Sequence, residues 1–89
     1  MIARNLVVKG KVQGVFYRAS AREKAEELGL FGWVKNRADG TVEIWVEGED
    51  RIVQEMTEWC RQGPARARVE EVEIKGVEPE GYWDFKVIR

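Results

Sequence analysis

The order in which apolar residues change their spacing is the feature that most restricts how this chain can fold. Leu6, Val8 and Val12 alternate with polar residues, which predicts a strand over about residues 4–12. Residues 17–28 then carry apolar side chains at helical spacing, and the glycine after them stands where a left-handed C-terminal cap belongs. The chain is therefore expected to begin with a strand, a loop and a helix.

A hairpin pattern follows this first helix. The segments "LFGWVKN" (30–36) and "TVEIWVEG" (41–48) have the composition of strands. Between them, Asp39 and Gly40 form a turn signal. On the two predicted strands, Trp33 and Trp45 fall on the sheet face opposite Val34 and Ile44.

The remaining residues predict one more helix and two more strands. Asp50 is placed to cap the helix, whose apolar stripe consists of Ile52, Met56, Trp59 and Cys60. A strand is expected around residues 69–75. A short final strand is predicted from three alternating apolar residues, Trp83, Phe85 and Val87.

This order is βαββαβ with a short extra terminal strand. It is typical of a ferredoxin-like α+β sandwich, in which two helices lie on one face of a mostly antiparallel sheet. The helical crossover makes the first two strands parallel, with the third expected between them. The loop after the first strand and Asn36 at the end of the second then share one sheet edge, about 10 Å apart. Arg18 and Asn36 are therefore expected to share a site.

Composition limits the classes of function. The 89 residues suit one domain, 1–89, and a net charge of -1 gives no reason to expect nucleic acid or a membrane surface as a partner. A single cysteine suits a reducing compartment, the first residues do not have the pattern of a signal peptide, and no apolar run is long enough to span a bilayer, so we expect a cytoplasmic protein. We also expect a monomer, although nothing in the sequence decides the oligomeric state. There is no histidine, which removes the usual neutral-pH general base.

The segment "QGVFYR" has the composition of an anion site. Gly14 permits a sharp turn, and the backbone N–H groups of residues 15–18 are then free donors at a helix N-terminus. Arg18 in the first helical turn opposes the helix dipole unless a bound anion offsets both charges. The alternative is that Arg18 reaches into water or pairs with an acid such as Glu23.

Two motifs in this chain together resemble a known family. "GKVQGVFYR" (10–18) and "GWVKNRADGTVEIWVEG" (32–48) are similar to the paired signature of the acylphosphatase family, and nearly the whole chain is covered by the likeness. The resemblance implies hydrolysis of the carboxyl-phosphate bond of acyl phosphates, without metal or cofactor. It implies catalytic roles for Arg18 and Asn36. It also implies a phosphate-binding loop of Gln13, Gly14, Val15, Phe16, Tyr17 and Arg18, in which Phe16 is a glycine in many members.

The chemistry of these residues favours the same reaction on separate grounds. An arginine, backbone amides and an asparagine can stabilise phosphoryl charge, but they include no obvious acid to protonate a leaving group. A carboxylate leaves unaided, because its conjugate acid has a pKa near about 4. We hypothesise that the Asn36 carbonyl accepts a hydrogen bond from a water and aims it in line. The alternative for Asn36 is that it caps its own turn.

Other interpretations of the chain stay open at this point. Trp33 and Trp45 could stack bases, as in RNA-recognition modules of the same topology, although no basic stripe accompanies them. A small-anion binding domain without turnover is a further alternative. Cys60 is expected in the core rather than as a nucleophile. We expect no metal at the acidic strand segment 70–73.

Overall fold

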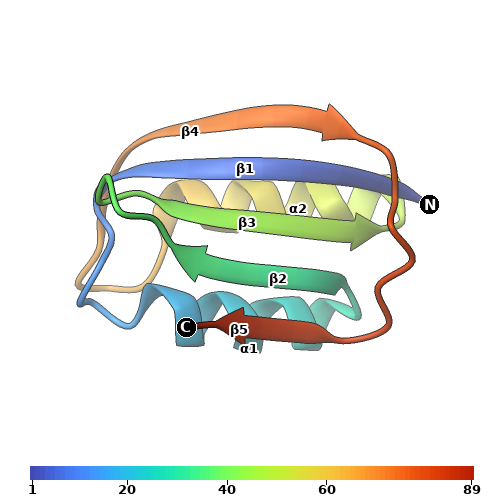
Figure 1. Ribbon diagram of the computed structural model, residues 1–89, viewed down its shortest axis with the longest axis horizontal. Helices are drawn as coiled ribbons and strands as arrows, with labels where there is room; N and C mark the ends of the chain where they lie inside the picture. Colours follow the sequence, from blue (N-terminus) through green and yellow to red (C-terminus); the bar gives the residue numbers. More distant parts are fainter.

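Five strands and two helices make up the fold of the computed structural model, which describes all residues from Met1 to Arg89. Figure 1 shows both helices on the same face of a single sheet. In chain order, the elements are β1 (Ile2–Lys11), α1 (Tyr17–Leu28), β2 (Phe31–Asn36), β3 (Val42–Gly48), α2 (Asp50–Gln62), β4 (Arg68–Val77) and β5 (Phe85–Ile88).

The order of strands in the sheet is β4-β1-β3-β2-β5. β3 lies between β1 and β2 and is antiparallel to both, so β1 and β2 run in the same direction. β5 adds to the far side of β2 as a parallel strand. The predicted ferredoxin-like sandwich with an extra terminal strand is confirmed.

The core lies between the sheet and the two helices. Val34 and Ile44 are paired across β2 and β3 and are fully buried, whereas Trp33 and Trp45 occupy the opposite face, as predicted. Buried side chains of the helices cover the inner face of the sheet: Tyr17, Ala21, Ala25, Val53, Met56 and Cys60. Cys60 is part of this core, which confirms its predicted structural place.

The helix ends agree with the sequence at one helix and differ at the other. Gly29 closes α1 in the left-handed conformation, and its N–H reaches the carbonyl oxygens of Ala25 and Glu26. The predicted cap at Asp50 is wrong, because Glu49 is the N-cap residue and no side chain caps the helix. Asp50 lies inside the first turn, where its negative charge interacts favourably with the positive end of the helix dipole.

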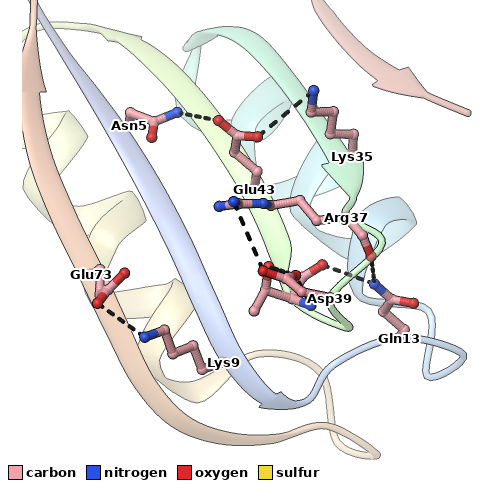
Figure 2. Close-up of polar contacts among 9 residues, drawn as sticks. Asn5, Lys9, Gln13, Lys35, Arg37, Asp39, Glu43 and Glu73 are labelled. Atoms are coloured by element: carbon pink, nitrogen blue, oxygen red, sulfur yellow. Dashed lines mark hydrogen bonds and ion pairs between the residues drawn. The ribbon is translucent and has the colours of Figure 1, made fainter.

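The open face of the sheet carries charged and polar side chains beside an aromatic cluster. Lys9 Nζ lies 3.0 Å from Glu73 Oε2, and Asn5 Nδ2 donates to Glu43 Oε2 at 3.0 Å (Figure 2). Trp33 and Trp45 stack with ring centroids 6.2 Å apart, and Tyr82 meets the Trp45 ring edge-on at 6.4 Å. These aromatic rings hold the segment before β5 against the sheet.

The indole N–H groups of both tryptophans are used inside the protein. Trp33 Nε1 donates to the Tyr82 hydroxyl at 3.2 Å, and Trp45 Nε1 donates to Glu47 Oε2 at 2.8 Å. The two rings therefore belong to an internally hydrogen-bonded cluster that packs on the sheet. Neither helix has the length and the apolar composition needed to cross a membrane.

The last strand begins later than the alternation predicts. β5 begins at Phe85, and Trp83 lies outside it with 80% of its surface exposed. The cause is Glu47, whose carboxylate accepts hydrogen bonds from the backbone N–H groups of Glu80, Gly81 and Tyr82. These bonds tie residues 80–82 to β3, and pairing with β2 begins at Asp84, whose carbonyl accepts from the Gly32 N–H at 2.9 Å.

Candidate active site

The loop between β1 and α1 leaves a row of backbone donors free. Gly14 has φ 75° and Phe16 has φ 65°, so two left-handed residues turn the chain sharply before the helix. The first N–H of this region with a backbone partner belongs to Ser20, which donates to the Phe16 carbonyl at 3.0 Å. The N–H groups of residues 14–19 make no hydrogen bond within the protein. They can therefore serve a bound anion.

Arg18 is a half-buried cation without an anionic partner in the protein. It lies in the first turn of α1, where no acidic residue is present. The alternative pairing with Glu23 is wrong, because Arg18 forms no ion pair. The guanidinium retains its full fork of donors for phosphate or carboxylate oxygens.

Asn36 ends β2 with a buried oxygen that lacks a donor. Its Oδ1 is the single buried side-chain polar atom without a hydrogen bond in the protein. The alternative in which Asn36 caps its own turn is also wrong. Asp39 caps it instead, since its Oδ1 accepts from the Thr41 N–H at 3.0 Å and the Thr41 hydroxyl at 2.6 Å. A buried unpaired oxygen costs about 1–3 kcal/mol, so Asn36 is prepared to accept from a water or a substrate.

One cavity of about 730 Å³ brings these groups together. Of the residues predicted from the sequence, it is lined by Gly14, Phe16, Tyr17, Arg18 and Asn36. Two members of the predicted loop do not line it. Val15 is buried in the core, and Gln13 uses its side chain elsewhere.

Gln13 connects the loop to the hairpin between β2 and β3. Its Nε2 donates to the carbonyl oxygen of Arg37 at 2.8 Å and to that of Thr41 at 2.9 Å. Figure 2 shows the Gln13 side chain pointing toward the hairpin, beside Arg37 and Asp39. The side chain therefore joins the two segments that carry the candidate site.

Sequence reasoning missed several charged residues of the cavity wall. Arg22 and Glu26 follow Arg18 at intervals of four on α1, and they pair with each other at 3.3 Å. Helical spacing from Arg18 was the signal that could have found them. Glu23 and the C-terminal Arg89 also line the cavity, the latter because β5 runs parallel to β2 and ends beside it.

Two buried ionisable groups, the Tyr17 hydroxyl and the Cys60 thiol, stay protonated at neutral pH. The Tyr17 hydroxyl donates to the Cys60 carbonyl at 2.7 Å, and burial raises the pKa of Tyr17 far above its usual value. Burial also raises the pKa of the Cys60 thiol to about 12, although the Tyr17 contact lowers it slightly. Neither group supplies a proton or a nucleophile at neutral pH.

Comparisons with known proteins agree with this geometry. A family model described as Acylphosphatase matches residues 4–87. A curated acylphosphatase of Marinobacter nauticus is 59% identical over 68 residues, which are 76% of this chain and 74% of that protein. One of Gloeobacter violaceus is 49% identical over 82 residues, or 92% of this chain and 88% of that protein.

Solved structures extend the likeness to the backbone. The crystal structure of acylphosphatase from Bacillus subtilis superposes on this chain with a TM-score of 0.97. The two sequences are 33% identical, and the superposition covers 100% of both chains.

Proposed function

This chain belongs to the acylphosphatase family, and we propose that Arg18, the loop amides and Asn36 carry out its reaction. It hydrolyses the carboxyl-phosphate bond of acyl phosphates to a carboxylate and inorganic phosphate. In our proposal, Arg18 and the N–H groups of the phosphate loop, Gln13 to Arg18, bind the phosphoryl oxygens. Asn36 positions the water.

The proposed step is an in-line displacement at phosphorus. The water oxygen attacks phosphorus, the bond from phosphorus to the bridging oxygen breaks, and the carboxylate leaves with the electron pair. Because a carboxylate is a good leaving group, the reaction needs no protonation there. Catalysis then consists of positioning and electrostatic stabilisation of the phosphoryl oxygens, as suits a loose transition state.

The observation that carries the proposal is the unpaired Oδ1 of Asn36 in the same cavity as the unpaired guanidinium of Arg18. An amide oxygen is too weak a base to deprotonate water. Its role is therefore to accept one hydrogen bond and orient the water oxygen toward phosphorus. The proton of that water passes to a phosphoryl oxygen in this scheme, which gives the phosphate product directly.

We also propose that residues 1–89 act as a single cytoplasmic domain and as a monomer, without metal or cofactor. A single buried cysteine is compatible with a reducing compartment. The edge strand β4 carries the charges of Arg68, Glu70, Glu71, Glu73 and Lys75. Charged side chains on an edge strand oppose pairing with a second copy.

The test is the initial rate of benzoyl phosphate hydrolysis in the presence of a chelator. We expect Arg18→Ala to lower kcat/KM by about a thousandfold, because it removes the charged phosphoryl ligand. We expect Asn36→Ala to lower kcat by about a hundredfold or more, with a smaller effect on KM. Circular dichroism checks that both variants fold.

Matched controls separate these roles from general damage. Arg51→Ala removes an exposed arginine of α2, and Asn5→Ala removes an asparagine of the open sheet face. Both are expected to keep wild-type turnover. Folded Arg18→Ala or Asn36→Ala protein with unchanged kinetics would show that the assigned residue has no part in the reaction.

A further inference from the structure

The two halves of the candidate site lie on strands that are not neighbours. The phosphate loop follows β1 and Asn36 ends β2, with β3 between them. The ladder of β1 with β3 ends at the pair Val8↔Val42, and the rest of β1 pairs only with β4. No backbone hydrogen bond of the sheet therefore fixes the loop relative to Asn36.

The side chain of Gln13 supplies that connection. Both of its hydrogen bonds come from Nε2, at 2.8 Å to the Arg37 carbonyl and 2.9 Å to the Thr41 carbonyl. The two hydrogens of one amide nitrogen are thus both used, which fixes the direction of the side chain. Gln13 directly precedes Gly14 of the loop, and Arg37 directly follows Asn36.

The two acceptors belong to a rigid part of the hairpin. The Arg37 N–H donates to the Thr41 carbonyl at 2.9 Å, and the Gly40 N–H donates to the Arg37 carbonyl at 3.2 Å. Each carbonyl accepts one bond from within the hairpin and a second from Gln13, so both lone pairs of each oxygen are occupied. The Asp39 cap on Thr41 restrains the same turn. If the two hydrogen bonds of Gln13 are lost, the hairpin keeps its own bonds, and the part that is freed to move is therefore the loop.

We infer that Gln13 is a positioning residue, which holds the phosphate loop at the distance from Asn36 that in-line attack requires. The inference rests on the proposed function of Arg18 and Asn36. Phosphoryl binding uses donors of the loop and α1, all on one side of this connection. The oriented water is on the other side. Loss of the Gln13 donors therefore disturbs the distance from water to phosphorus and leaves phosphate binding intact.

Gln13→Met is the first variant to measure, because methionine keeps the length of the side chain and removes both donors. We expect kcat for benzoyl phosphate to fall about tenfold to a hundredfold, since a misplacement of about 1 Å has effects of that size. KM and the inhibition constant of inorganic phosphate are expected to stay within about twofold. The matched control is Gln54→Met on α2, because Gln54 lies outside the cavity. It should leave kcat as well as KM unchanged.

A double-mutant cycle tests whether Gln13 acts through Asn36. In the Asn36→Ala background, Gln13→Met should lower kcat by less than about twofold, because the water is already unoriented. A purely structural role would lower kcat in both backgrounds. If Gln13→Met does not fold, Gln13→Asn takes its place, because its amide is one methylene too short to span both carbonyls.

The outcomes separate this inference from the proposed function. Loss of turnover in Asn36→Ala together with normal turnover in Gln13→Met would overturn the inference alone. A raised KM and a weakened phosphate inhibition with unchanged kcat would make Gln13 a phosphate ligand instead. Independent, multiplying effects of the two substitutions would also overturn it. Full turnover in Asn36→Ala would contradict the proposed role of Asn36, and the inference about Gln13, which rests on that role, would be wrong as well.

Discussion

At the scale of single residues, Phe16 has a backbone conformation that its side chain disfavours. It is the only non-glycine residue with positive φ, and 70% of its surface is exposed. A left-handed conformation costs a residue with a Cβ roughly 1–2 kcal/mol. The strain has a use, because this conformation turns the chain from the loop into the first turn of α1, where the donors are free.

Phe16→Gly is therefore expected to raise the free energy of unfolding by about 0.5–1 kcal/mol. The gain is the relieved strain, less the greater flexibility of glycine in the unfolded chain. Urea unfolding measures it. Phe16→Ala is the control, because alanine keeps the Cβ and the strain, so it should give no such gain. A less stable Phe16→Gly protein would mean that packing of the phenyl ring outweighs the backbone strain.

At the scale of elements, Glu47 determines how the last strand joins the sheet. Burial alone would raise the pKa of Glu47, but hydrogen bonds from the Glu80 N–H, the Trp45 indole and two further backbone N–H groups lower it below its usual value. The carboxylate is therefore favoured in the folded state. A group with a lowered folded-state pKa stabilises the fold above its unfolded-state pKa, and this contribution is lost as the pH falls through the folded-state pKa.

Glu47→Gln is expected to lower the free energy of unfolding by about 1–3 kcal/mol at pH 7, because an amide cannot accept all the donors that meet there. The difference from wild type should shrink as the pH falls below the unfolded-state pKa of about 4.3, because the unfolded chain then takes up a proton at Glu47 before the folded protein does. Urea unfolding at pH 7 and pH 3 measures both values. Glu73→Gln, on an exposed pair with Lys9, should change stability by less than about 1 kcal/mol. A difference that grows in acid would contradict this account of Glu47.

The elements themselves were predictable because each has a local cause. Alternation and helical spacing repeat within a few residues, so five strands and two helices follow from the sequence. That the phosphate loop and Asn36 lie at the same edge of the sheet was also predictable, because the helical crossover makes β1 and β2 parallel. The link from Gln13 to the hairpin and the link from Glu47 to the last connection were not predictable. They join residues 24 and 33 positions apart through side-chain geometry. The sequence pattern placed Trp83 in the last strand because it carries no sign of the bonds between Glu47 and the connection before that strand.

At the scale of the whole molecule, the candidate site joins two halves of the fold. Arg18 and the loop belong to the β1–α1 unit, and Asn36 belongs to the β2–β3 hairpin. A ligand that binds only the folded state raises its stability by RT ln(1 + [L]/Kd), which is about 2.7 kcal/mol at one hundred times Kd. Inorganic phosphate, the reaction product, is such a ligand in our proposal.

Phosphate at one hundred times its Kd should therefore raise the Tm by about 10–20 °C, since 1 kcal/mol corresponds to about 4–8 °C in a domain of this size. Calorimetric scans of wild type and Arg18→Ala, in phosphate and in chloride of equal ionic strength, measure the shift. Phosphate also stabilises proteins by exclusion from their surface, and that part remains in Arg18→Ala. The specific part is the difference between the two proteins. Equal shifts in both would mean that phosphate binds without Arg18, and the cavity would then need another cation, Arg22 or Arg89, as its anchor.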